Sequence, residues 1–188
     1  MSFIDISAFE DCISLKSISI PNSVTAIFDY AFRYSGLESI TIPDGVTAIG
    51  DDAFEGCSKL SHVTIPSSVT TMGEFAFYWC DGLKNIIISN GVTIIGEGAF
   101  CECNAVTGIT IPSSVTTIGD HAFRNCFELT NITIPDGVIY IGYAAFAYCN
   151  NLINVIIPDG ITTINDYIFC GCSSLTRAYL KTQNDYII

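Results

Sequence analysis

Residues 53–66 read AFEGCSKLSHVTIP, and this phrase, continued by Val69 and Gly73, recurs along the whole chain. Its Phe returns after 22 residues once and otherwise after 23, at Phe9, Phe32, Phe54, Phe77, Phe100, Phe123, Phe146 and Phe169. A fixed period of roughly 20–50 residues is typical of a solenoid, in which each coil buries its apolar face against its neighbours. The sequence therefore predicts one solenoid domain over residues 1–188, with about eight coils.

Each coil is predicted to contain one short strand. Val63 and Ile65 alternate with His62 and Thr64, which is the period-two pattern of a strand with one buried face. Pro66 then ends the strand, because proline cannot donate to a ladder and holds the residue before it in an extended conformation. We expect the strands of successive coils to pair into one parallel sheet, about 4.7–4.9 Å apart.

The side of the coil opposite the sheet is predicted to hold a short helical turn that begins at the Ala-Phe pair and packs Phe and Cys inward. A Gly precedes this turn in most coils, which indicates a corner with positive φ, at Gly50, Gly73, Gly96, Gly119 and Gly142. An acid follows the corner, at Asp29, Asp51, Glu74, Glu97, Asp120 and Asp166. We expect these acids to cap the helical turns by accepting hydrogen bonds from free backbone N–H groups. A cation ladder of stacked carboxylates that binds Ca²⁺ is the alternative.

Nine cysteines raise the question of disulfides or metal. Seven of them share one phase of the repeat, Cys12, Cys57, Cys80, Cys103, Cys126, Cys149 and Cys172, and we expect buried free thiols there because a small apolar side chain suits a crowded interior. Parallel side-chain directions and the odd number argue against disulfides. Isolated Cys-x-Cys steps offer too few ligands for zinc. The two cysteines outside this phase, Cys101 and Cys170, are predicted to be the reactive ones.

The sequence shows no pattern of a catalytic site. His62 and His121 fall at different phases, two or three coils apart, and no Ser or Cys nucleophile recurs beside either of them. We therefore expect no catalytic residue, no metal site and no cofactor.

The charge balance limits the class of partner. The chain has 19 acidic residues and 7 Lys or Arg, which gives a formal net charge of −12. This charge repels phosphate backbones and anionic lipid, so nucleic acid and membrane surfaces are poor partners and cations or basic protein patches fit better. No apolar run approaches the ~18 residues that span a bilayer, so we expect no membrane insertion.

The phrase AFEGCSKLSHVTIP with Val69 and Gly73 resembles the BspA-like leucine-rich repeat, the 23-residue, Treponema-type class found in surface proteins of bacteria and some protists. The resemblance covers essentially the whole chain. It implies an α/β-type solenoid, a curved right-handed coil with a parallel sheet on one face and short helical turns on the other. It also implies an adhesin that binds host or matrix proteins, or itself, at the cell surface or outside the cell.

The start of the chain differs from that expectation. Residues 1–5 have neither the basic region nor the long apolar stretch of a signal peptide. We expect either a cytosolic or unconventionally exported protein, or one piece of a longer chain.

The outward strand positions form the predicted binding face, since exposed sheets supply extended binding surfaces in solenoids. The candidate residues are His62, Thr64, Asn85, Ile87, Thr110, Asn131, Thr133, Asn154, Ile156, Arg177 and Tyr179. These columns are small and polar and lack the clustered Trp, Tyr and Arg of binding hot spots. Ladders of polar side chains that only tolerate water are therefore an alternative. A flat Thr array is also similar to an ice-binding surface, although Ile87, Gly108 and Ile156 interrupt it.

Aromatic residues gather elsewhere and offer a second candidate patch. Phe75, Tyr78 and Trp79 lie in one coil, and Tyr140, Tyr143 and Tyr148 follow further along the chain.

Both ends of the chain keep the interior pattern of the repeat. Phe3 and Ile4 at one end, and Ala178 and Leu180 at the other, are candidate end contacts, because a solenoid without polar caps exposes its core and open strand edges. Beyond Leu180, Lys181 and Asn184 replace the Pro and Val of the phrase, which predicts a partly blunted end. Head-to-tail stacking through these ends would be heterologous and would make an open filament.

Taken with the resemblance, these features predict a non-enzymatic protein-binding or adhesion module. A structural protomer that forms a homo-oligomer by end-to-end stacking is the alternative.

Overall fold

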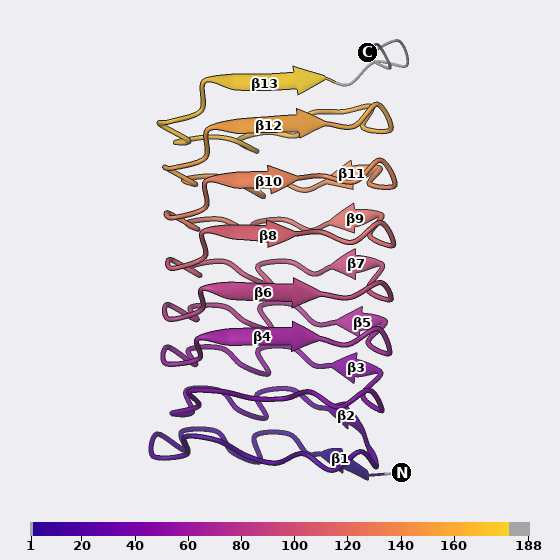
Figure 1. Ribbon diagram of the computed structural model, residues 1–188, viewed down its shortest axis with the longest axis vertical. Coiled ribbons are helices and arrows are strands. Elements are labelled where there is room, and N and C mark those ends of the chain that lie inside the picture. Colours follow the sequence, from indigo (N-terminus) through magenta and orange to yellow (C-terminus); the bar gives the residue numbers. More distant parts are fainter. Residues whose placement is uncertain (1, 181–188) are drawn as a thin grey trace.

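Strands of successive coils pair in parallel, as predicted, in the computed structural model, which describes residues 2–180 (Figure 1). The first sheet has the order β13-β12-β10-β8-β6-β4. Its members are β4 (His62–Ile65), β6 (Asn85–Ile88), β8 (Gly108–Thr110), β10 (Asn131–Thr133), β12 (Asn154–Ile157) and β13 (Arg177–Leu180). The coils before β4 keep the coil-to-coil contact without a regular ladder, since the Glu38 N–H donates to the Lys16 carbonyl at 2.9 Å. The fold is a parallel β-solenoid of about eight turns.

A second wall of parallel strands, which the sequence analysis did not predict, follows the proline turn. The chain reverses there because the Val69 N–H donates to the Pro66 carbonyl at 3.1 Å, and in Figure 1 the arrows of β5, β7 and β9 run opposite to those of the first sheet. Two sheets make up this wall. They are β1 (Ser2–Ile4), β2 (Val24–Ile27), β3 (Ala48–Ile49) and β5 (Thr71–Met72), and then β7 (Ile94–Ile95), β9 (Thr117–Ile118) and β11 (Tyr140–Ile141).

The predicted helical turns are wrong: residues 2–180 contain no helix, and therefore none that could cross a membrane. The third wall, called the turn wall below, consists of the turns around each core Phe, such as residues 30–34. Its backbone N–H groups donate alternately to a carbonyl of the same coil and to a carbonyl of the next coil. The Arg33 N–H donates to the Tyr30 carbonyl at 3.0 Å, whereas the Tyr34 N–H donates to the Glu55 carbonyl at 2.7 Å. In an α-helix each N–H donates to the carbonyl four residues earlier. The N–H groups that donate to the next coil cannot make that hydrogen bond, so no helix forms.

Two residues in every coil have positive φ, which is how the turn wall changes direction. They stand two positions before and two positions after each Phe, and most of them are not glycine. Trp79 has φ 57° and Tyr148 has φ 62°, a conformation that costs roughly 1–2 kcal/mol for a residue with a Cβ. The coil-to-coil hydrogen bonds hold these residues in place. The right-handed sense and the curvature implied by the resemblance stay predictions.

The glycine corner has a different cause from the one predicted. Positive φ among glycines occurs at Gly56, Gly98 and Gly171, and not at the corner position. A Cβ on Gly142 would lie 2.3 Å from Asp120 Oδ1 and 2.4 Å from the Asp120 nitrogen, in the preceding coil. Glycine fits this corner because the preceding coil leaves no room for a Cβ, whereas Phe28 and Asn165 occupy the same position in two other coils.

Three of the acids that follow the corner, Asp29, Asp51 and Asp120, accept backbone hydrogen bonds, but from the next coil and not from a helical turn of their own. The Tyr143 N–H donates to Asp120 Oδ1 at 2.8 Å, and the Glu74 N–H donates to Asp51 Oδ1 at 2.8 Å. The predicted helix cap is therefore wrong in its location, although the type of hydrogen bond is the expected one.

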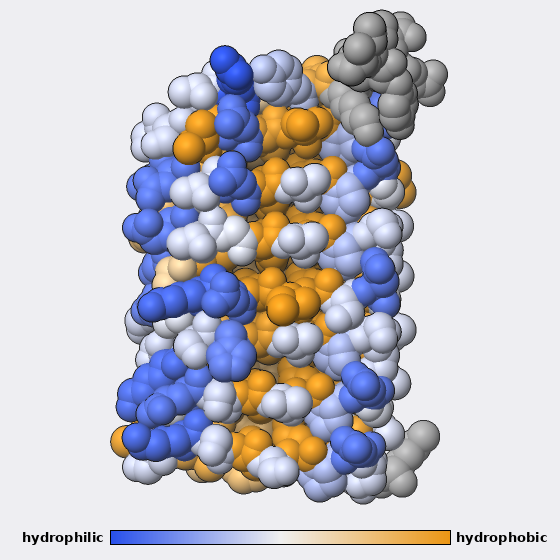
Figure 2. Space-filling model, viewed as in Figure 1, coloured by the Kyte–Doolittle hydropathy of each residue, from blue (hydrophilic) through white to orange (hydrophobic). Residues whose placement is uncertain are grey.

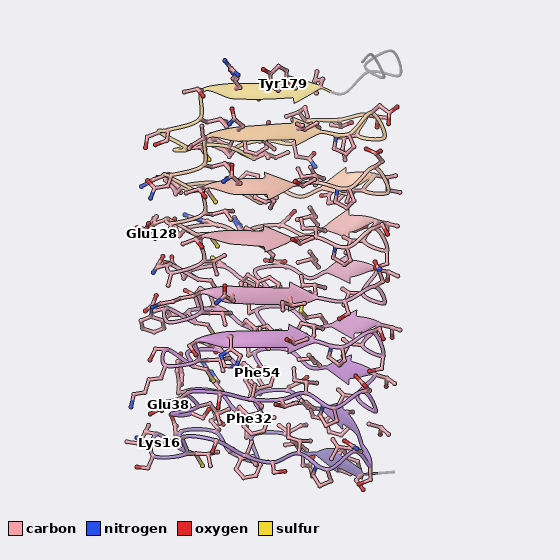
Figure 3. The ribbon with its side chains drawn as sticks, viewed as in Figure 1. Lys16, Phe32, Glu38, Phe54, Glu128 and Tyr179 are labelled. Carbon is pink, nitrogen blue, oxygen red and sulfur yellow. The ribbon has the colours of Figure 1, made fainter. Side chains whose placement is uncertain are left out.

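Phenylalanine and cysteine form two columns inside the coils. The Phe rings stack with centroids 4.9–5.7 Å apart from Phe9 to Phe169, and Figure 3 shows Phe32 and Phe54 within this stack. Every thiol of the column except that of Cys12 donates to the carbonyl of a Phe, as in Cys80 to Phe54 at 3.2 Å. All nine cysteines are free. The prediction of buried thiols is confirmed at Cys57, Cys80, Cys103, Cys126 and Cys149, whereas Cys12 and Cys172 in the end coils are partly exposed.

Cys101 corrects the prediction about reactive thiols. It is only 6% exposed, and burial raises the pKa of its thiol to about 12. Cys170 is partly exposed. Because the thiolate is the nucleophile, a buried thiol with a raised pKa reacts slowly.

Thiol labelling tests this account. With iodoacetamide at about pH 8, we expect labelling at the three partly exposed thiols, Cys12, Cys170 and Cys172, and protection of Cys101 and of the buried column until the chain unfolds. Mass spectrometry of peptides sampled over time measures the order. Rapid labelling of Cys101 or Cys126 in the folded protein would contradict it.

Substitution at Asp120 tests the coil-to-coil hydrogen bond. Asp120→Asn keeps an acceptor for the Tyr143 N–H and should be nearly neutral, whereas Asp120→Ala should lower the free energy of unfolding by about 1 kcal/mol. Urea denaturation measures both variants. Glu97→Ala is the matched control, because the Glu97 carboxylate accepts no hydrogen bond from a described residue, and an equal loss there would refute the role assigned to Asp120.

Candidate functional site

The outer face of the first sheet, called the sheet face below, presents the two columns that the sequence predicted. Parallel register places His62 beside Asn85 and Thr64 beside Ile87. The register continues from Asn85 to Gly108 and Asn131, and from Ile87 to Thr110. All eleven candidate residues are exposed: His62, Thr64, Asn85, Ile87, Thr110, Asn131, Thr133, Asn154, Ile156, Arg177 and Tyr179. These residues lie on the outer strand positions, and binding by them stays a prediction.

The sheet face is hollowed at two places. One depression of about 450 Å³ lies over β6, β8 and β10, where Gly108 has no neighbour within 4 Å of the position that a Cβ would take. A second depression of about 470 Å³ lies between Ile40 and Ser89 and includes His62 and Thr64. Figure 2 shows an apolar band running along this face between hydrophilic flanks.

The apolar band is exposed at particular residues of the second column. Ile87, Ile156 and Tyr179 are 58%, 51% and 52% exposed, and Figure 3 shows Tyr179 on β13 at one end of the face. An apolar centre with a polar rim is the usual anatomy of a protein interface. The exposed pair Lys16–Glu38, at 3.2 Å on the flank, contributes little to stability because water screens it.

The two histidines do not form a reactive arrangement with other described residues. His62 lies on the sheet face with Nδ1 3.1 Å from Ser61 Oγ. His121 lies on the turn wall, where its ring packs edge-on against Tyr143 at 5.3 Å. Among residues 2–180, no three His, Cys, Asp or Glu side chains come together as a set of metal ligands.

The predicted end contacts lie at opposite ends of the stack. Phe3 is 54% exposed and Ile4 partly exposed on β1, whose neighbour in the sheet is β2. Ala178 and Leu180 are exposed on β13, the edge of the first sheet. Lys181 and Asn184 lie outside the described residues.

The turn wall holds a charged cluster that the sequence analysis missed. Arg33 pairs with Glu55 in the next coil and with Glu10 in the previous one, and the Tyr34 hydroxyl donates to Glu55 at 2.7 Å. The hydrogen bond to Glu55 raises the pKa of both Arg33 and Tyr34. Burial, together with the Glu55 carboxylate, raises the pKa of Asp52 to about 6. Comparing the residue after each Phe from coil to coil, Glu10, Arg33 and Glu55, would have revealed this cluster.

The aromatic patches are also on the turn wall. Phe75 contacts Tyr78 edge-on at 5.7 Å, and Tyr143 contacts Tyr167 at 5.5 Å. Tyr140 is separate from them, since it belongs to β11 in the second wall.

Solved structures show the same architecture. A leucine-rich repeat protein from Bacteroides ovatus ATCC 8483 superposes with a TM-score of 0.79 at 28% identity, over 94% of this chain and 52% of its own. The leucine rich repeat protein of T. pallidum gives 0.77 at 31% identity, over 82% and 73%. A leucine rich cell surface protein from Faecalibacterium prausnitzii A2-165 gives 0.53 at 26% identity, over 95% and 63%. The chain thus spans about half the length of the Bacteroides ovatus protein.

A comparison with curated proteins finds no significant match. The BspA type leucine rich repeat region, by contrast, matches residues 2–126 and 93–188, which together include nearly the whole chain. With the 23-residue phrase, the stacked coils and this match in agreement, the chain belongs to the BspA-type leucine-rich-repeat family.

Proposed function

We propose that this chain is a non-enzymatic protein-binding module that acts in adhesion, with the sheet face as its contact surface. The observation that carries the proposal is the continuous hollowed face with an apolar band between polar flanks. Because the inner strands β6, β8, β10 and β12 are paired on both sides, the face is ordered before a partner arrives, which lowers the entropy cost of binding.

The partner that fits this surface is a protein, and the family resemblance points to a host or matrix protein. A net charge of −12 favours a partner with a basic rim and disfavours nucleic acid and anionic lipid. A location at the cell surface or outside the cell is part of the proposal, supported by the similar cell surface protein from Faecalibacterium prausnitzii.

Paired charge substitutions on two walls test the sheet face. Ile87→Lys with Ile156→Lys places two charges in the apolar band. Ile94→Lys with Ile139→Lys places the same charges on the second wall, where these residues are 50% and 64% exposed. For any protein bound from a panel of purified matrix proteins, surface plasmon resonance should show the Kd rising about tenfold or more for the first pair, because burying an unpaired charge is costly. The second pair should bind like the wild type.

Both double variants should keep the thermal midpoint of the wild type, because all four positions are exposed. Equal loss of binding in both, or no loss in the first, would contradict the role of the sheet face.

A second candidate function, self-association end to end, is favoured by a particular groove. At the β1 end an apolar groove of about 360 Å³ is lined by Phe3, Ile4, Phe9, Ile18 and Ile20, among others. At the other end β13 is the edge strand of the first sheet within residues 2–180, with Ala178 and Leu180 exposed. An open edge and an apolar groove are complementary to another coil of the same repeat, so a second copy of this chain is the proposed occupant.

Charges at the two ends test the stacking. We expect the wild-type mass in light scattering to grow with concentration, and Ile4→Lys or Leu180→Glu to hold the chain at the monomer mass, because each charge would face an apolar surface. Mixing the two variants should restore one contact by pairing opposite charges. The Ile94→Lys and Ile139→Lys variant is the control and should associate normally. A wild-type monomer at high concentration would refute self-association and leave the sheet face unaffected.

A further inference from the structure

The turn wall contains two arginines at the same position of the repeat, and only one has charged partners. Arg33 and Arg124 both follow a core Phe directly. Arg33 lies between Glu10 and Glu55 of the adjacent coils and pairs with both. The residues that stand at those places beside Arg124 are a cysteine and an alanine, Cys101 and Ala147. The adjacent coils therefore supply no carboxylate at this position.

The unpaired arginine is partly buried. Within residues 2–180, Arg124 makes no ion pair and no hydrogen bond through its side chain, and its Nε is a buried donor without an acceptor. A buried donor left unsatisfied is unfavourable. The two Nη atoms are not among the buried ones, so an acceptor that approaches the guanidinium from solvent meets them.

A hollow beside Arg124 has the size and lining of a small-ligand site. It has a volume of about 290 Å³, with Arg124, Tyr143, Tyr148 and Tyr167 around it and the buried Ala144 and Ala147 within its lining. The guanidinium carbon lies 5.6 Å from the centre of the Tyr148 ring, which orients the cation. Aromatic walls with one charged group are typical of sites that bind small organic molecules.

The electrostatics of the hollow favour an anion of limited size. The residues that line it include Arg124 and no acid. A neighbouring hollow on the other side of Arg124 includes Glu102, which accepts a hydrogen bond from Asn125, so that side is unfavourable for an anion. The net charge of −12 opposes a long polyanion. A single carboxylate is the group that the guanidinium best accommodates, through two parallel hydrogen bonds.

We propose that this hollow binds a small molecule with one carboxylate on a ring, either a sugar acid or an aromatic acid. The carboxylate accepts hydrogen bonds from the two Nη atoms of Arg124, and the ring packs against Tyr143, Tyr148 and Tyr167. The tyrosine hydroxyls are available to ring hydroxyl groups. This site is on a different wall from the sheet face, so it does not depend on the function proposed above.

The Arg33–Glu55 pair suggests a variant that blocks the site. Ala147→Glu would place a carboxylate next to Arg124 as Glu55 is placed next to Arg33, and Glu55 is buried at that position without disrupting the coil. We expect this variant to fold and to lose the ligand, because the internal carboxylate occupies the guanidinium. Arg124→Gln should lose the ligand by removing the charge, and Arg124→Lys should weaken binding because an ammonium cannot form the two parallel bonds.

Isothermal titration with glucuronate and glucose, and with 4-hydroxybenzoate and phenol, tests the proposal on the intact chain. We expect one of the two acids to bind with a Kd on the order of 1 mM or tighter, and its neutral counterpart to bind at least about tenfold more weakly. Arg33→Gln is the matched control and should keep wild-type affinity. Binding of glucuronate alone identifies a sugar acid, and binding of 4-hydroxybenzoate alone identifies an aromatic acid.

Several results would overturn the proposal. They are failure of both acids to bind at about 10 mM, equal affinity for an acid and its neutral counterpart, or unchanged affinity in Arg124→Gln. Should Ala147→Glu unfold, the comparison of Arg124→Gln with Arg33→Gln decides the question, because both substitutions remove one guanidinium from the same position of the repeat.

Discussion

Hydrogen bonds between successive coils set the spacing on which the rest of this structure depends. The Phe32 N–H donates to the Ala53 carbonyl and the Phe54 N–H to the Ala76 carbonyl, each at 2.8 Å, and comparable bonds continue along the three walls. At this spacing every side chain meets its own counterpart from the next coil, about 4.8 Å away. Residues that pack well against copies of themselves therefore fill the interior, as the stacked phenylalanines do. Charges of opposite sign also suit neighbouring coils, as Arg33 does between two glutamates.

The sequence was sufficient for the features that depend on alternation and period. The pattern of Val63 and Ile65 predicted the first sheet and its register, and the single phase of cysteines predicted buried thiols. The turn wall could not be predicted, because Phe and Cys three residues apart point inward in a helix and in these turns alike. The helix and these turns differ in which carbonyl each backbone N–H donates to, and the side-chain pattern does not depend on that difference. Positive φ at Trp79 and Tyr148 likewise gives no signal in the sequence.

The candidate sites differ in how visible they are in the sequence. The sheet face follows from strand alternation alone, so its eleven residues could be named in advance. The hollow beside Arg124 requires two further facts, the absence of an acid in the adjacent coils and the burial of Nε. The first can be found by comparing equivalent positions between coils. The second depends on how the tyrosines pack and is available only from coordinates.

The contact between Asp120 and Gly142 has a consequence for how such a chain changes its length. The acceptor belongs to one repeat and the glycine that makes room for it to the next, and the same holds for Asp29 with Gly50 and Asp51 with Gly73. A duplicated stretch of one full period that includes Gly50 and Asp51 carries both the acid and the glycine. Each new repeat then completes the junction with the repeat before it and offers the same junction to the repeat after it. Gene duplication and deletion can therefore add or remove whole coils without any compensating substitution, and the length of the solenoid is free to vary in evolution while its cross-section stays constant.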